Sequence, residues 1–138
     1  MAFECGVLGR SGGQTARESL ADLLAHLLAE DPDVSHDSVK EGEGWAASRI
    51  RVARSGEAIL EQYLQVSVGG EIVDFYLDSA REVLGEGGIQ GMDLMLTTIL
   101  SGMVDPVIND RIAAYALAEW HGVPWDETSG FTASAPCD

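Results

Sequence analysis

The chain has 138 residues, 46% of them hydrophobic, and it carries 23 Asp and Glu against 8 Lys and Arg, a formal net charge of −15. This length and apolar content fit one folded domain and argue against global disorder. The charge repels polyanions and anionic membranes, so we expect neither nucleic acid nor a membrane as a partner. No apolar run reaches the ~20 residues of a bilayer span, and the N-terminus lacks a signal-peptide pattern, which predicts a cytoplasmic protein.

The two cysteines, Cys5 and Cys137, lie one near each terminus. A reducing compartment favours two free thiols, and a disulfide that joins the chain ends is the alternative.

The first predicted element is a helix that begins at Thr15 and ends near Glu30. Thr15 and Glu18 have the spacing of a capping box, in which each side chain accepts a hydrogen bond from the other residue's backbone N–H. Leucines then recur at helical spacing, at Leu20, Leu23, Leu24, Leu27 and Leu28. Pro32 disfavours helical geometry at the residue before it. Ahead of this helix, residues 1–14 allow at most a short strand from Phe3 to Leu8.

Residues 31–44 are acidic and poor in apolar residues, which predicts a solvated loop. Residues 45–78 are rich in β-branched and aromatic residues, and Ser55-Gly56 and Gly69-Gly70 divide them into three runs, which predicts an antiparallel meander. A three-residue loop at 55–57 places Arg51 opposite Glu61, and a two-residue turn at Gly69-Gly70 places Leu64 opposite Phe75.

This register gives the predicted sheet two different faces. The core face carries Ile50, Val52, Leu60, Leu64, Val66, Val68, Val73, Phe75 and Leu77. The polar face carries Arg49, Arg51, Glu61, Tyr63, Gln65, Ser67, Ile72, Asp74 and Tyr76.

The C-terminal half is predicted to be helical. Ser79 and Glu82 form a second capping box before a short helix that ends at Gly85, and residues 92–104 are apolar enough for a buried helix. Asp105 as N-cap and Pro106 at the first helical position start a last helix that runs to about His121. The predicted fold is therefore α+β: an N-terminal helix, a three-stranded antiparallel β-meander, and two to three C-terminal helices packed on one sheet face. Residues 1–122 form this single domain, and residues 123–138 form a flexible tail.

No motif for a metal, a cofactor or catalysis is present in this sequence. Oxygen-bearing side chains alternate from Asp31 through Asp33 and Ser35 to Asp37 as in a calcium-binding loop, but His36 stands where that loop needs Gly and Gly42 where it needs Glu. The three histidines share no metal-binding spacing, and there is no G-x-S-x-G sequence. We therefore expect no cofactor, no metal site and no enzymatic activity.

The acids are densest in the first predicted helix and the loop after it. They are Glu18, Asp22, Glu30, Asp31, Asp33, Asp37, Glu41 and Glu43. The helix offers one position per ~6 Å along one face, whereas a DNA strand carries one charge per ~3.4 Å, so the helix alone is too sparse to mimic DNA. An ordinary solvated surface is the alternative interpretation of these acids.

The polar sheet face is the second candidate surface. Tyr63 and Tyr76 fall opposite each other in the predicted register, near Arg49 and Arg51, and tyrosine and arginine are enriched at interface hot spots. The alternative is that the tail or a helix covers this face.

These features lead to two hypotheses about function. The first is a non-enzymatic acidic binding protein, an inhibitor or immunity-type protein of the anti-CRISPR, anti-restriction or antitoxin class, which blocks a basic site on a protein partner. The second is a structural or assembly subunit, such as a phage or mobile-element component or a chaperone-like protein, which acts through oligomeric contacts. The acidity could also serve solubility or salt adaptation, and the sequence does not predict the oligomeric state.

Overall fold

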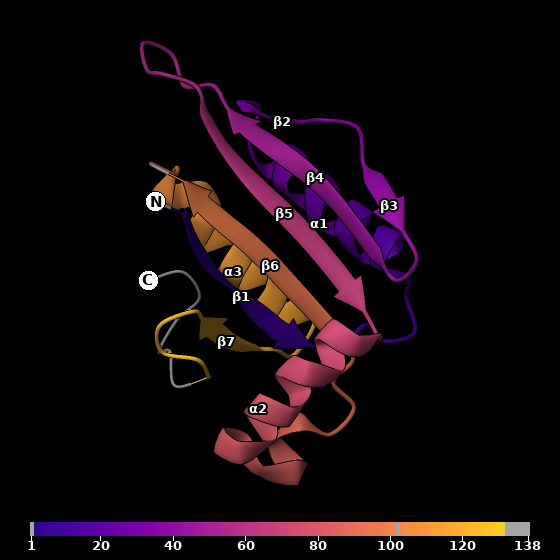
Figure 1. Cartoon of the computed structure of the whole chain (residues 1–138). Coiled ribbons are helices and arrows are strands. Elements are labelled where there is room, and N and C mark those ends of the chain that lie inside the picture. The colour runs from indigo at the N-terminus through magenta and orange to yellow at the C-terminus, as the bar shows by residue number, and fades with distance from the viewer. Residues whose placement is uncertain (1, 102, 132–138) are drawn as a thin grey trace.

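The described chain, residues 2–101 and 103–131 of a computed structural model, folds around one antiparallel sheet (Figure 1). The strands are β1 (Ala2–Gly9), β2 (Val34–His36), β3 (Lys40–Gly42), β4 (Trp45–Val52), β5 (Leu60–Val68), β6 (Leu94–Ser101) and β7 (Val123–Asp126). The helices are α1 (Ala16–Glu30), α2 (Glu71–Ile89) and α3 (Pro106–Glu119). The sheet order is β2-β4-β5-β6-β1-β7, and β3 also pairs with β4.

Helices lie on both sides of this sheet. α1 and α3 pack on one face, where the α1 leucines join Leu64, Leu96 and other inward residues in the main core. α2 packs on the opposite face, where Val73 and Ala80 join Leu8, Met95 and other residues in a second core. Because neighbouring residues of a strand point to opposite faces, Met95 and Leu96 belong to different cores. α2 lies at one end of its face in Figure 1, so much of that face has no helix over it.

The predicted fold was wrong in its sheet and in the packing of its helices. Only the first two strands of the predicted meander exist, as β4 and β5 of a seven-stranded sheet, and the helices do not share one face. Residues 71–78 were predicted to be its third strand, but they form the start of α2. Apolar residues here also fit helical spacing, because Val73, Leu77, Ala80 and Leu84 face the second core. Ser79 consequently lies inside α2 and caps nothing, although Gly85 does interrupt the helix with φ 76°.

The predicted buried helix at 92–104 was also wrong, since residues 94–101 form the strand β6. β6 lies between β5 and β1. The Leu94 and Leu96 side chains face one core and Met95 faces the other, so both faces of this segment are apolar. A strand that is buried on both faces loses the alternation that would distinguish it from a buried helix.

Elements with strong local signals are confirmed. α1 carries the Thr15–Glu18 capping box and ends at Glu30. α3 follows the Asp105 N-cap with Pro106 in its first turn. β4 and β5 pair in the predicted register, with Arg51 opposite Glu61.

The two ends of the chain and the acidic loop contribute more to the sheet than predicted. β1 extends over Ala2–Gly9, and the predicted loop at 31–44 contains β2 and β3. β7 pairs with β1, and Trp125 and Phe131 are buried in the second core. Residues 132–138 lie outside the described residues, so the flexible tail stays a prediction there. Cys137 is one of them; Cys5 is described and is not a free thiol, so the prediction of two free thiols was wrong for this residue.

Within the described residues, no helix combines the length and the apolarity that crossing a membrane requires.

Candidate binding surface

Several of the predicted contact acids neutralise arginines of the chain itself. Asp31 is buried, and its carboxylate lies 2.8 Å from Nη1 of Arg54. The same Nη1 lies 3.0 Å from Asp33, while Nε of Arg54 lies 3.2 Å from Asp105, the N-cap of α3. Arg54 thus ties the end of α1 and the start of α3 to the loop after β4. This network leaves Asp31 largely out of reach of a partner.

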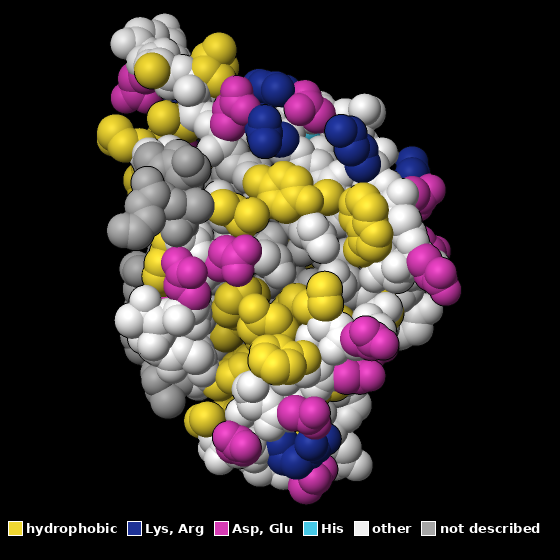
Figure 2. All heavy atoms as spheres, viewed as in Figure 1, with side chains coloured by type: hydrophobic (Ala, Val, Ile, Leu, Met, Phe, Trp, Pro, Cys, Tyr) yellow, Lys and Arg dark blue, Asp and Glu magenta, His cyan; other side chains and the backbone are white. Residues whose placement is uncertain are grey.

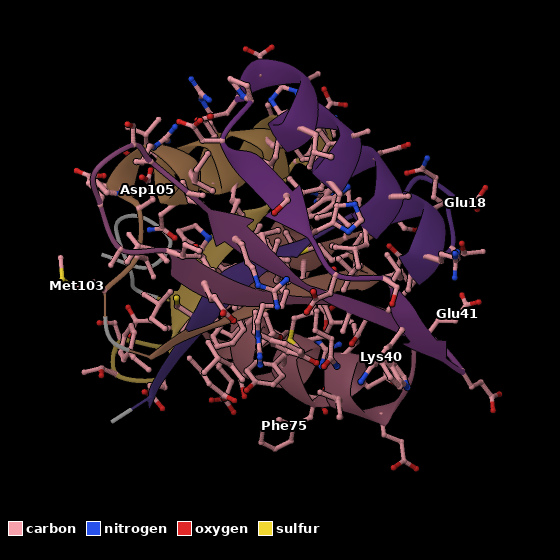
Figure 3. The ribbon with its side chains drawn as sticks, turned by 90° about the horizontal axis from the view of Figure 1, so that it is seen from above. Glu18, Lys40, Glu41, Phe75, Met103 and Asp105 are labelled. Carbon is pink, nitrogen blue, oxygen red and sulfur yellow. The ribbon has the colours of Figure 1, made fainter. Side chains whose placement is uncertain are left out.

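The other predicted acids differ in whether their carboxylates form ion pairs or hydrogen bonds within the chain. Asp37 accepts two hydrogen bonds from the Arg51 guanidinium, and Glu41 pairs with Arg17 at 3.1 Å. Glu18 closes the capping box of α1. Asp22 accepts a hydrogen bond from Gln14, while Glu30 and Glu43 are exposed. Figure 3 shows Glu18 and Glu41 at one side of the molecule.

Hydrogen bonds to the carboxylates of the Arg54 network keep them ionised. The backbone N–H of Asp33 lowers the pKa of Asp31 most; burial opposes this effect, and Arg54 lowers the pKa further. Burial acts to raise the pKa of Asp105, but hydrogen bonds from Arg54 and from the Ile108 N–H outweigh it, so this pKa is lowered as well. A group with a folded-state pKa below its unfolded value stabilises the fold above that unfolded value, and the contribution is lost as the pH falls through the folded pKa.

Replacing Asp105 by asparagine tests this network through its pH dependence. Asparagine is an equally good N-cap, so the variant loses mainly the charge opposite Arg54. We expect the free energy of unfolding at pH 7 to fall by about 2 kcal/mol. The gap to the wild type should begin to close as the pH falls below about 4, the ordinary pKa of an aspartate, and should be lost once the pH falls through the lowered pKa of Asp105 in the folded protein. Urea unfolding of both proteins between pH 7 and pH 2.5 checks this, and a gap that stays constant with pH would contradict it.

The surface with interface chemistry is the part of the second sheet face that α2 leaves uncovered. We call this surface the open face; it consists of Trp45, Ala47, Arg49, Arg51, Glu61, Tyr63, Gln65, Thr97 and Ile99. The strand register arranges these residues in rows across the sheet. Arg49 lies opposite Tyr63, which in turn lies opposite Ile99, and the next row runs from Ala47 through Gln65 to Thr97.

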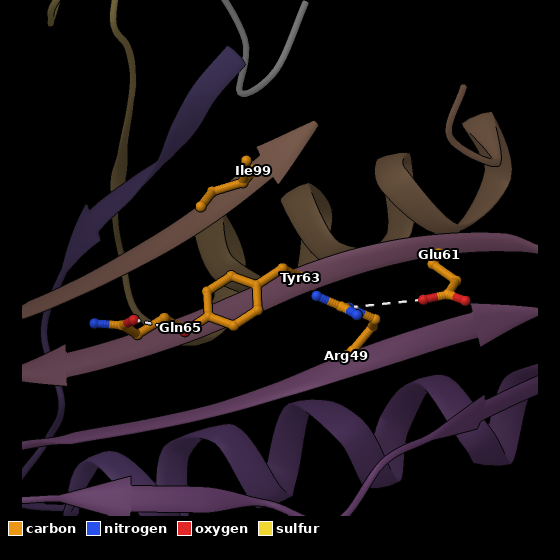
Figure 4. Close-up of a pocket in the computed structure, with 5 residues that line it drawn as sticks. All are labelled: Arg49, Glu61, Tyr63, Gln65 and Ile99. Carbon is orange, nitrogen blue, oxygen red and sulfur yellow. Dashed lines mark hydrogen bonds and ion pairs between the residues drawn. The ribbon is translucent and has the colours of Figure 1, made fainter. Parts of the chain in front are cut away.

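The open face is hollowed between these rows. One hollow of about 580 Å³ is lined by Arg49, Glu61, Tyr63, Gln65 and Ile99 (Figure 4). The Tyr63 hydroxyl donates a hydrogen bond to Gln65 at 2.8 Å, which fixes the ring along the sheet. Arg49 lies 3.7 Å from Glu61, and both side chains are about half exposed, so this ion pair holds Arg49 weakly.

A second hollow adjoins the first, because Arg49 and Tyr63 line both. It has a volume of about 280 Å³, and its lining also includes Lys40 and Trp45 from β3 and β4. The Ala47 side chain, which is 3% exposed, forms part of its floor. The small alanine methyl group leaves room between the long side chains around it.

Apolar side chains of α2 lie on the same side of the molecule as the open face. Ile72 is 62% exposed and Phe75 is 67% exposed. Figure 3 shows Phe75 projecting on the side where Lys40 also lies. In Figure 2, hydrophobic side chains gather over the middle of this side, most of the visible Lys and Arg side chains lie toward its upper edge, and Asp and Glu surround it.

The two predicted tyrosines belong to different elements. Tyr63 lies on the open face as predicted, with Arg49 and Arg51 beside it. Tyr76 lies on α2, where its ring packs 5.0 Å from the ring of Trp125, so the predicted pairing of the two tyrosines was wrong.

Sequence reasoning missed four residues of the open face, which are Trp45, Ala47, Thr97 and Ile99, and it also missed Lys40, which lines the second hollow. Trp45 was missed although it alternates with Arg49 and Arg51 along β4, a signal that would have placed it on the polar face. Lys40 fell in a predicted loop, and Ile99 fell in a predicted helix, so neither could be assigned to a sheet face.

Among the residues that the structure describes, no group of three or more His, Cys, Asp or Glu side chains is placed to hold a metal ion. No protein-family model, curated protein or solved structure matches this chain. The function of this chain is therefore inferred from the arrangement of its side chains.

Proposed function

We propose that this chain is a non-enzymatic binding protein of the inhibitor or immunity type, which contacts a protein partner through the open face of its sheet. The observation that carries the proposal is the hollowed row of Arg49, Tyr63 and Ile99, with Trp45 beside it. Tyrosine, tryptophan and arginine are the side chains most enriched at interface hot spots. They stand here on paired strands, so little conformational entropy is lost when a partner binds.

The net charge has a separate role in this proposal. Long-range attraction mainly raises the rate of association, whereas buried contacts mainly set the rate of dissociation. A charge of −15 steers the chain toward a partner with a basic surface. The exposed acids Glu30 and Glu43 contribute to this field. Asp31, Asp33 and Asp37 contribute less, because Arg54 and Arg51 neutralise them.

Site-specific photocrosslinking in the cells that encode this chain tests the proposal. One variant carries benzoylphenylalanine in place of Tyr63, and a second carries it in place of Glu30 on α1. We expect position 63 to give one dominant protein adduct and position 30 to give little, because only the first residue faces the open hollows. An adduct that forms mainly from position 30 would assign the contact to the acidic surface of α1 and would contradict the proposal.

A second candidate function is an assembly subunit that binds copies of itself or other subunits. The exposed Ile72 and Phe75 beside the open face favour it, because apolar side chains of this size are often covered in an assembly. Light scattering after size exclusion separates the two functions. A monomer at high concentration would argue against self-assembly and leave the first proposal in place.

A further inference from the structure

The lysine and arginine side chains of this chain differ in whether an acceptor oxygen lies close to the charged group. Six of the eight have a carboxylate or carbonyl oxygen within 3.5 Å: Arg10, Arg17, Arg51, Arg54, Arg81 and Arg111. The two others are Lys40 and Arg49. Among the described residues no carboxylate oxygen lies within 4.0 Å of the Lys40 ammonium, and Arg49 has only the 3.7 Å contact to Glu61.

Lys40 and Arg49 line the same hollow. Lys40 lies opposite Ala47 in the register of β3 and β4, and Arg49 lies two residues after Ala47 on β4. The two cations therefore flank the small residue that forms part of the floor. Ser38 also lines this hollow and adds a hydroxyl group that can hydrogen-bond an anion, whereas the Ser48 hydroxyl already donates to the backbone carbonyl of Asp37.

The charge around this hollow is positive although the chain is strongly acidic. Asp37 also lines the hollow, but both of its carboxylate oxygens accept hydrogen bonds from Arg51. These hydrogen bonds hold the pKa of Asp37 below its usual value, so the Asp37–Arg51 pair stays ionised and neutral overall. Of the other residues that line the two hollows, Lys40 and Arg49 are positive and Glu61, which pairs with Arg49, is negative, so the lining carries one positive charge in excess.

The walls of the hollows are aromatic and apolar. Trp45 and Tyr63 line the hollow beside Lys40, and Ile99 lines the adjoining hollow beside Tyr63. A ligand that fills both hollows would place an anionic group between Lys40 and Arg49 and an apolar group against Tyr63 and Ile99.

We infer that the two hollows receive an acidic side chain of the protein partner together with a neighbouring apolar or aromatic side chain. This inference rests on the proposed function and specifies the chemistry that the partner presents. A segment of protein fits better than a free small molecule, because both hollows open along the exposed sheet face (Figure 2), whereas small-molecule sites enclose most of their ligand. A second copy of the chain fits less well, because two charges of −15 repel each other.

A nuclear magnetic resonance titration of the full chain with two blocked tetrapeptides tests this inference. One peptide has the sequence Gly-Phe-Glu-Gly, and its control has Gln in place of Glu. We expect the Glu peptide to shift the indole N–H signal of Trp45 and the ring signals of Tyr63, and to bind about fivefold more tightly than the Gln peptide. Trp45 reports selectively, since Trp120 and Trp125 are 3% and 2% exposed.

Three variants show where the carboxylate binds. Lys40→Gln and Arg49→Gln should each weaken the Glu peptide to about the affinity of the Gln peptide, and Arg81→Gln on α2 should leave it unchanged. Equal binding of the two peptides, shifts that map elsewhere, or no shift at up to about 10 mM peptide would overturn the inference. Benzoate that binds as tightly as the Glu peptide would also overturn it, in favour of a free small carboxylate.

The two proposals can fail separately. A crosslink from position 63 combined with equal binding of the two peptides would keep the binding function and discard the carboxylate. Charge-dependent peptide binding without a crosslinked partner would keep the carboxylate site and discard the proposed binding function.

Discussion

Replacing Arg54 by methionine is expected to lower the melting temperature by about 10 °C, a large effect for one partly exposed residue. Methionine keeps much of the apolar stem but removes the guanidinium that faces three carboxylates. Asp31 and Asp105, whose side chains are only 7% and 10% exposed, would then face each other's charge without this counterion. Circular dichroism at pH 7 measures the change in melting temperature.

Arg81→Met is the matched control for this variant. Arg81 also pairs with two acids, Asp78 and Glu86, but their side chains are 73% and 80% exposed. Ion pairs at such exposure contribute little, so we expect a shift of no more than about 2 °C. Equal shifts for the two variants would show that the Arg54 network does not hold α1 and α3 together.

Replacing Gly6 by alanine is expected to destabilise the protein by about 3 kcal/mol or more. Gly6 lies in the middle of β1, paired with both β6 and β7. A Cβ atom at this position would lie 1.8 Å from the backbone oxygen of Leu96 and 3.2 Å from the Trp125 ring. Since Leu96 belongs to the neighbouring strand, only a separation of the two strands would relieve the clash.

Gly87→Ala in α2 makes the same chemical change without the clash. A Cβ atom at Gly87 meets no heavy atom within 4 Å, so we expect the stability to be unchanged or to rise by up to about 1 kcal/mol. Urea unfolding of both variants measures the difference. A Gly6→Ala protein with the unfolding midpoint of the wild type would show that β1 does not pair with β6 in this way.

Local signals were enough to predict about half of the architecture. The capping box of Thr15 and Glu18 located α1, and Asp105 with Pro106 located α3, because caps are formed by residues close in sequence. The alternation in residues 45–68 gave the register of β4 and β5.

The remaining errors arose where long-range pairing decides between helix and strand. The apolar side chains of residues 71–78 fit both the two-residue period of a strand and the ~3.6-residue period of a helix. The helix forms because it packs against Leu8 and Met95 in the second core. Residues 94–101 are apolar on both faces because β6 lies between two other strands. No residue close in sequence indicates that this segment pairs on both sides.

The candidate surface was predictable only in part for the same reason. Arg49, Arg51 and Tyr63 follow from the register of β4 and β5. Ile99 joins them through β6, and Lys40 joins them through β3, so their place on the surface depends on the correct sheet. The engagement of Asp31 was likewise hidden, because Arg54 and Asp105 are distant from it in sequence.

We propose that the partner contacts the open face and that the acids mainly steer the chain toward the partner. The most direct measurement is the ratio of crosslinked partner from position 63 to that from position 30, in cells that express equal amounts of the two proteins. We expect a large excess from position 63, and we expect that adding Arg49→Ala reduces this adduct. A ratio near or below one would rule out the open face as the main contact and would assign the contact to the acidic surface of α1.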